Sequence, residues 1–171
     1  MEDLPIEHCY WVVPGVFLAG EYPRNLDETS SRAKLDALVG AGVRTFVDLT
    51  EDRDGLLPYV PLLLAYRDQG VSHRRFPVAD QGVPVSRGFA AGILDAIDEE
   101  IAKGQAVYLH CWGGIGRTGT IVGCWLARQG LAGSAALHRL AQLWQHCPKS
   151  RYRRSPENEL QERFIKEWQE Q

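Results

Sequence analysis

Apolar residues along the chain follow two patterns, and each pattern predicts a kind of element. Short continuous apolar runs indicate buried strands, whereas apolar residues that recur every three or four positions indicate helices with one face in a core. The expected strands lie within residues 11–20, 43–49, 73–76 and 107–109. The expected helices lie within 30–42, 59–68, 86–104, 118–130 and 134–147, with a last one after 155. This order predicts an α/β fold with a central, largely parallel sheet flanked by helices.

Capping residues give the expected helix boundaries. Ser30 or Ser31 is expected to cap the first helix, and Ser86 to cap the helix in which apolar residues recur every four positions. The pair Ser155-Pro156 is typical of an N-cap followed by a first-turn proline. Residues 51–55 are mostly charged and are expected to form a polar loop.

One segment is richer in chemistry than the rest, because residues 106–120 read AVYLHCWGGIGRTGT. The apolar run predicts a buried strand and Thr118 onward predicts a helix, so the loop between them directs several backbone N–H groups at one point. Anions bind at such helix N-termini. Glycines in the loop let a ligand approach the main chain closely. We therefore predict a phosphate-binding loop made of Trp112, Gly113, Gly114, Ile115, Gly116 and Arg117.

Cys111 and Arg117 are the reactive pair that this loop would hold. A helix N-terminus and a neighbouring arginine favour the anionic, nucleophilic form of a thiol. The planar guanidinium can hold two phosphate oxygens at once, which a lysine cannot do with the same geometry. The pattern predicts in-line attack of Cys111 on phosphorus, a phosphocysteine intermediate and hydrolysis by water, with the loop amides stabilising the transition state.

The run HCWGGIGRTG at 110–119 resembles the signature loop of the cysteine-based protein phosphatases, and its glycine-rich core is most similar to the small dual-specificity branch that includes kinase-associated phosphatase. The resemblance covers nearly the whole chain. It implies that Thr118 hydrogen-bonds the sulfur of Cys111 and helps it leave, and that His110 orders the loop through its ring. It implies no metal and no cofactor. A cysteine in the second half of the chain argues against the low-molecular-weight tyrosine phosphatases.

Asp80 is the expected general acid and base, because a leaving alkoxide or phenoxide needs a proton. It lies in FPVADQGVP at 76–84, which resembles the acid loop of the dual-specificity phosphatases. An ordinary turn aspartate is the alternative interpretation. Asp48, at the end of an expected strand, is a weaker candidate acid. Four further acids are expected on the solvated face of a helix, namely Asp95, Asp98, Glu99 and Glu100.

Composition limits the class of protein. The length of 171 residues and the 44% hydrophobic content suit one catalytic domain over 1–171. The net charge of −3 gives no general attraction to nucleic acid or membranes. The N-terminus has no signal-like pattern, so we expect a cytoplasmic protein, monomeric, with a phosphorylated protein as its partner. The four cysteines have neither metal-ligand nor disulfide spacing, although Cys9 or Cys147 could react with an oxidised Cys111.

The leading hypothesis is a dual-specificity phosphatase for phosphotyrosine and phosphoserine or phosphothreonine. The alternatives are a phosphatase for small molecules, lipids or RNA, and a phosphoprotein-binding module without turnover. Inositol lipids rank low, because the five residues between Cys111 and Arg117 include no Lys or Arg. A basic connection could either balance nearby acids or steer acidic substrates. It contains Lys149, Arg151, Arg153 and Arg154.

Overall fold

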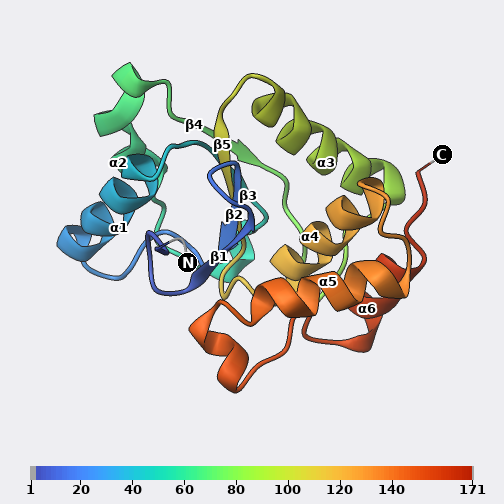
Figure 1. Cartoon of the computed structure of the whole chain (residues 1–171). Helices are drawn as coiled ribbons and strands as arrows, with labels where there is room; N and C mark the ends of the chain where they lie inside the picture. Colours follow the sequence, from blue (N-terminus) through green and yellow to red (C-terminus); the bar gives the residue numbers. More distant parts are fainter. Residues whose placement is uncertain (1–2, 171) are drawn as a thin grey trace.

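The computed structural model describes residues 3–170, which contain one five-stranded sheet in the order β1-β2-β5-β3-β4 (Figure 1). β1 and β2 are antiparallel, and all other neighbouring strands are parallel. The predicted α/β fold with a largely parallel sheet is therefore confirmed. The strands are β1 Cys9–Val13, β2 Phe17–Gly20, β3 Val43–Asp48, β4 Ser72–Arg75 and β5 Ala106–His110.

Helices cover both faces of this sheet (Figure 1). The α-helices are α1 Glu28–Gly40, α2 Val60–Leu63, α3 Arg87–Ala102, α4 Gly116–Arg128, α5 Ser134–Trp144 and α6 Glu159–Lys166. Three short 3₁₀ helices span Asp52–Asp54, Leu64–Gln69 and Pro148–Arg151. The helix expected over 59–68 is thus a single α-turn followed by 3₁₀ turns. Among the described residues, no helix combines the length and the apolar character that crossing a bilayer requires.

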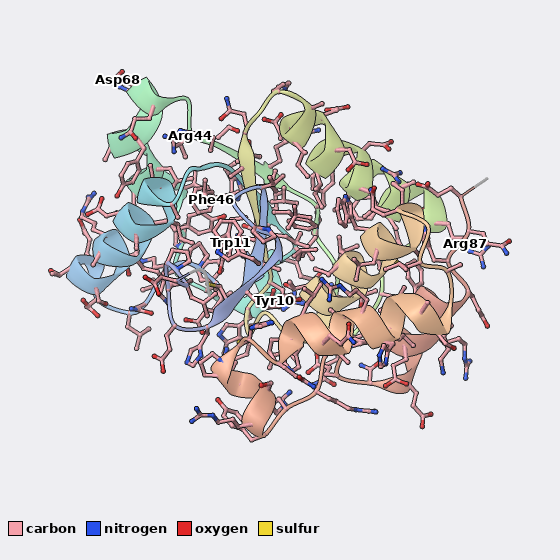
Figure 2. The ribbon with its side chains drawn as sticks, viewed as in Figure 1. Tyr10, Trp11, Arg44, Phe46, Asp68 and Arg87 are labelled. Carbon is pink, nitrogen blue, oxygen red and sulfur yellow. The ribbon has the colours of Figure 1, made fainter. Side chains whose placement is uncertain are left out.

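The sheet separates two apolar cores, because successive residues of a strand point to opposite faces. Val107 and Leu109 of β5 pack with α3, α4, α5 and α6, whereas Tyr108 packs with α1 and the segment around α2. Phe46 and Tyr10 lie in the interior, while Asp68 and Arg87 lie at the outside (Figure 2). β5 is the middle strand and all its residues are buried, so the segment that follows it leaves the sheet at a fixed position.

Helix caps were predicted correctly at one helix and wrongly at two. Ser86 caps α3 by accepting a hydrogen bond from Phe89 N at 3.0 Å. α1 begins earlier than expected, because Asp27 is its cap and accepts from Ser30 N at 2.7 Å. α6 begins later than expected, with Asn158 as its cap. Ser155 is buried instead, and its hydroxyl donates to Ile115 O at 2.6 Å. A tertiary contact thus replaces the expected cap.

Candidate active site

The loop after β5 forms one wall of a pocket of about 400 Å³, which we call the Cys111 pocket. Cys111 follows β5 directly, and α4 starts at Gly116, so the loop joins the central strand to a helix N-terminus as predicted. Asp80 and Arg117 line the same pocket as Cys111. The remaining lining residues are Gln81, Trp112, Gly113, Ile115, Gly116, Lys149, Tyr152, Arg153 and Glu157.

One loop glycine, Gly114, is required by a close approach of the backbone, whereas the close neighbour of Gly116 is the end of a flexible side chain. Gly114 has a φ of 74°, and a Cβ there would lie 2.4 Å from the backbone carbon of Gly20 at the end of β2. A Cβ on Gly116 would lie 2.2 Å from Oε1 of Glu157. Gly114 therefore packs against β2, and it does not line the pocket as the sequence had suggested for all the loop residues.

Arg117 is almost completely buried beside Cys111. Its Nη1 donates to Oδ2 of Asp54 at 2.7 Å and to Val78 O at 3.0 Å. Its Nη2 lies 3.3 Å from Oδ1 of Asp80 but makes no hydrogen bond with any residue that the structure describes. Burial by itself lowers the pKa of the guanidinium, but Cys111, Asp54 and Asp80 outweigh burial and raise it. The arginine is therefore a fixed positive charge with donors still available.

Asp54 is a site residue that the sequence did not reveal. Its carboxylate is 4% exposed, and it holds Nη1 of Arg117 from a 3₁₀ turn in the segment expected to be a polar loop. The two residues are 63 positions apart. A charged residue among other charged residues carries no sequence signal of burial, so only the folded chain identifies this contact.

Asp80 lies at the pocket mouth with its side chain 48% exposed. Its Oδ1 accepts from Gln81 N at 3.0 Å, and Gln81 has a φ of 61°, in the left-handed region. The cap and the first turn of α6 hold this loop: Asn158 donates to Gln81 O at 2.9 Å, and Gln161 donates to Gly82 O at 3.1 Å. The C-terminal helix therefore positions the predicted acid.

Thr118 differs from the expectation. Its Oγ1 is buried and makes no hydrogen bond within the described residues, so the expected bond to the sulfur of Cys111 is absent in this structure. The neighbouring Thr120 uses its hydroxyl differently, by donating to Gly116 O at 2.8 Å in the first turn of α4. Thr118 thus keeps a donor that no group in the described part of the chain satisfies.

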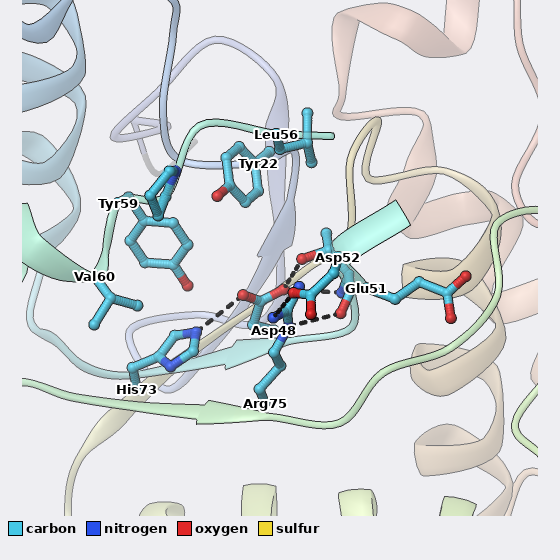
Figure 3. A pocket seen from close by; sticks show the side chains of 11 residues that line it. Tyr22, Asp48, Glu51, Asp52, Leu56, Tyr59, Val60, His73 and Arg75 are labelled. Carbon is cyan, nitrogen blue, oxygen red and sulfur yellow. Dashed lines mark hydrogen bonds and ion pairs between the residues drawn. The ribbon is translucent and has the colours of Figure 1, made fainter. Parts of the chain in front are cut away.

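Asp48, Tyr59 and His73 line a second cavity, of about 240 Å³ (Figure 3), and form a polar cluster with His110, which does not line it. We call Asp48, Tyr59, His73 and His110 the His110 network. His110 Nδ1 lies 3.1 Å from Cys111 O, and Nε2 lies 2.6 Å from the hydroxyl of Tyr59. A carbonyl only accepts, so Nδ1 carries the proton and Nε2 accepts from Tyr59. Burial lowers the pKa of His110, which favours this neutral ring.

Asp48 is the anion of this network. Its Oδ1 accepts from Thr50 N at 2.9 Å and from Thr50 Oγ1 at 2.6 Å, and its Oδ2 lies 2.9 Å from Nε2 of His73. Burial by itself raises the pKa of this carboxyl. His110, His73 and Thr50 lower the pKa by a larger amount, so the net shift is downward. Asp48 lines the cavity in Figure 3 and not the Cys111 pocket, so it is poorly placed as the acid.

The other candidates lie apart from the pocket. Three acids of α3 form ion pairs at the surface as expected, Asp95 and Asp98 with Arg128 and Glu99 with Arg74. Glu100 differs from the expectation of a solvated face, because its side chain is only 12% exposed, pairs with Lys103 and accepts a hydrogen bond from Thr45 Oγ1 at 3.0 Å. Cys9 is fully buried, and burial is the main cause that raises its pKa to about 12. Among residues 3–170, no three His, Cys, Asp or Glu side chains are arranged to hold a metal ion.

Some residues of the basic connection line the Cys111 pocket, and others lie outside it. Lys149 and Arg153 line the Cys111 pocket. Lys149 Nζ donates to Gly113 O at 2.8 Å and to Glu21 at 3.1 Å, while Arg153 pairs with Glu157 at 3.1 Å. Arg151 and Arg154 do not line the pocket, and Arg154 pairs with Glu162 at 2.9 Å. Part of the predicted positive charge therefore faces the site, and part balances acids elsewhere.

A thiol between a central strand and a helix N-terminus, with an arginine and an aspartate in the same pocket, is the arrangement of the dual-specificity and protein tyrosine phosphatases. Residues 6–165 match the model described as PTP-SAK, the DSP-PTPase phosphatase domain of Swiss Army Knife proteins, and the chain belongs to that family.

Individual relatives agree with this assignment. "Putative tyrosine phosphatase 067L" of Invertebrate iridescent virus 3 is 32% identical over 97 residues, which are 55% of this chain and 38% of that protein. The chain thus matches well under half of the length of this relative. A mutant form of Tk-PTP superposes with a TM-score of 0.69 at 28% identity, covering 92% of both chains.

Two more distant structures share the fold alone. Kinase associated phosphatase superposes with a TM-score of 0.73 at 18% identity, covering 96% of this chain and 94% of that one. PTPMT1 in complex with PI(5)P superposes with a TM-score of 0.69 at 20% identity, covering 92% of both.

Proposed function

We propose that this chain hydrolyses phosphotyrosine and phosphoserine or phosphothreonine in proteins through a phosphocysteine intermediate. The observation that carries the proposal is that Cys111, Arg117 and Asp80 line one pocket, although they come from a strand end, a helix start and a separate loop. A phosphoprotein-binding module would not need an acid at the pocket mouth, so Asp80 favours turnover over binding alone.

In the first step, the thiolate of Cys111 attacks phosphorus, the P–S bond forms and the bond to the leaving oxygen breaks. Asp80 in its acid form gives its proton to that oxygen. Charge accumulates on the equatorial phosphate oxygens, where Nη2 of Arg117 and the loop amides are available to donate. Asp54 holds Nη1, so the guanidinium is oriented before substrate arrives.

In the second step, the carboxylate of Asp80 takes a proton from water, and the water oxygen attacks phosphorus as the P–S bond breaks. Inorganic phosphate and the Cys111 thiolate are the products. We assign Thr118 as the donor to the departing sulfur, because its buried hydroxyl makes no hydrogen bond within residues 3–170 and so keeps its proton available. His110 holds the loop through Cys111 O and transfers no proton.

A lipid or nucleotide phosphomonoester is the second candidate substrate, because Lys149 and Arg153 bring positive charge to the same pocket. We favour protein substrates, since both cations are already paired with Glu21 and Glu157. As parts of the same proposal, the protein works in the cytoplasm as a monomer and needs no cofactor.

The test compares the wild type with Cys111→Ser on an aryl phosphate, phosphotyrosine and phosphothreonine peptides, PI(5)P and a nucleotide. The wild type is expected to hydrolyse the peptides with the highest kcat/KM. The variant is expected to lose turnover and to keep its affinity for tungstate, because the phosphate-binding loop survives. Appreciable turnover by the variant would show that Cys111 is not the nucleophile. A preference of the wild type for PI(5)P or the nucleotide would show that proteins are not the main substrate.

A further inference from the structure

Trp112 belongs to the catalytic loop, yet its side chain is 58% exposed. It lines the Cys111 pocket on one side and a second, larger hollow of about 720 Å³ on the other. The second hollow is formed by Tyr22, residues 24–27 and 54–57, and Trp112, and we call it the Trp112 groove. The indole is therefore shared between the reaction site and an adjoining surface.

The Trp112 groove carries exposed apolar side chains that the fold does not use. Leu26 is 89% exposed and Leu57 is 45% exposed. Two leucines and a tryptophan that share one hollow form the kind of apolar patch that marks an interaction site, whereas single exposed apolar residues are ordinary. Since the groove and the Cys111 pocket meet at Trp112, a molecule in one extends naturally into the other.

Hydrogen bonds fix the walls of the groove before any ligand binds. Tyr22 N donates to Trp112 O at 2.8 Å, and the hydroxyl of Tyr22 donates to Leu57 O at 2.7 Å. Arg24 Nη1 donates to Pro58 O at 2.7 Å, which joins the two wall segments a second time. A preformed groove loses little conformational freedom when a ligand binds. Most of the free energy gained by burying its apolar surface therefore contributes to affinity.

The charges in the groove favour a peptide over a membrane. Its ionic residues are Arg24, Asp27 and Asp54, of which Asp27 caps α1 and Asp54 holds Arg117. Anionic lipid surfaces attract clusters of lysine and arginine, and this lining has a net negative charge. An extended peptide advances about 3.3 Å per residue and presents alternate side chains to a surface, so residues near the phosphorylated one can reach the groove.

We propose that the Trp112 groove is a specificity site that binds an apolar side chain flanking the phosphorylated residue of a protein substrate. This inference rests on the proposed phosphatase function. Trp112 then serves both sites, with one side toward the phosphorylated residue and the other toward its apolar neighbour. The expected preference is for Leu, Ile, Phe or Met over Gly or a charged residue at one flanking position.

The test first measures kcat/KM of the wild type for phosphotyrosine peptides that carry Leu or Gly at each of the three positions on either side. One flanking position is expected to favour Leu. The double variant Leu26→Ser and Leu57→Ser is then compared with Leu64→Ser, which alters an exposed leucine outside both hollows. The double variant is expected to lose roughly 10-fold in kcat/KM for the Leu peptide and nothing for para-nitrophenyl phosphate. The control is expected to match the wild type.

The outcomes separate this inference from the function on which it rests. If the wild type hydrolyses all the peptides equally, or the double variant keeps the Leu preference, the groove proposal is overturned while the phosphatase proposal stands. If the wild type hydrolyses para-nitrophenyl phosphate but no peptide, the protein substrate itself is wrong. The double variant could instead lose activity only on PI(5)P in phosphatidylcholine vesicles. That result would show that the groove binds a membrane, and it would overturn the proposal that the groove binds a peptide side chain.

Discussion

The Cys111 pocket and the His110 network lie on either side of one loop, and they differ in how their polar atoms are satisfied. In the His110 network, both oxygens of Asp48 and both ring nitrogens of His110 have partners within the protein. In the Cys111 pocket, Nη2 of buried Arg117 makes no hydrogen bond to any described residue. The same is true of Oγ1 of Thr118, which follows Arg117 in the chain but does not line the pocket.

Under the proposed function, this difference is the one expected between a supporting cluster and a reacting one. Buried polar groups almost always have partners, because an unsatisfied one costs about 1–3 kcal/mol. A fully satisfied network stiffens its surroundings, which suits residues that hold Cys111 O in place. Unsatisfied donors beside a thiol are suited to a ligand that brings its own acceptors, such as a phosphate. The following variants test whether the two clusters divide support and chemistry in this way.

The largest effect in this comparison is expected from Asp80→Asn in the Cys111 pocket. Without a proton donor, kcat/KM for a phosphotyrosine peptide is expected to fall roughly 10²- to 10⁴-fold, and the alkaline limb of its pH profile is expected to disappear. Asp95→Asn is the matched control, because Asp95 is also an exposed aspartate paired with an arginine. An unchanged pH profile for Asp80→Asn would assign the acid to another residue.

A smaller loss is expected from Asp54→Asn, which keeps the shape of the side chain and removes the charge that holds Arg117. The guanidinium is then free to turn toward Asp80, so kcat is expected to fall about 10-fold, equivalent to about 1.4 kcal/mol of transition-state stabilisation. KM is expected to change less. Steady-state kinetics over a range of substrate concentrations measure kcat and KM separately. A change in KM alone would make Asp54 a substrate-binding residue instead.

Asp48→Asn is expected to affect stability more than catalysis. The pKa of Asp48 is lowered on folding, so its contribution is complete above its unfolded pKa of about 3.9 and is lost as pH falls further. The pKa of His110 is also lowered, so wild-type stability already declines below about pH 6.5. At pH 7 the variant is expected to lose about 1.5–3 kcal/mol, the strength of hydrogen bonds to a charged group.

Urea unfolding of the wild type and Asp48→Asn between pH 7 and pH 3 measures this contribution. The difference between the two free energies of unfolding is expected to stay constant above about pH 4 and to begin to narrow below it, because the folded pKa of Asp48 lies well below its unfolded value. The variant is expected to keep most of its kcat at 25 °C. If Asp48→Asn instead loses as much kcat as Asp80→Asn and keeps its stability, the His110 network takes part in the reaction and does not merely support the loop.

The smallest effect is expected in the basic connection. Arg153 lines the Cys111 pocket but is paired with Glu157, so Arg153→Ala is expected to lower kcat/KM for an acidic phosphopeptide only about 3-fold. Arg154→Ala is the control, because Arg154 pairs with Glu162 outside the pocket. The effect is expected to shrink as salt rises. Equal effects of the two variants would show that neither arginine acts at the site.

The sequence by itself determined the central features of this protein. The strand, the loop and the start of α4 are contiguous, so their order along the chain already places Cys111 and Arg117 on one loop. The alternation of strands and helices determined the α/β fold with its largely parallel sheet, because these elements can bury their apolar faces in few other ways. Asp80 was also predicted to belong to the site from its local surroundings, and it lines the pocket, but the sequence did not predict its contact with Arg117.

Only the tertiary structure decided which distant side chains complete the site. Asp54 meets Arg117 across 63 positions, α6 holds the Asp80 loop, and Ser155 binds Ile115 O instead of capping a helix. The sequence also did not show which residues of the basic connection face the pocket and which do not. The physical reason is that periodicity and capping are local, whereas the partner of a buried charge or hydroxyl depends on which segments packing brings together.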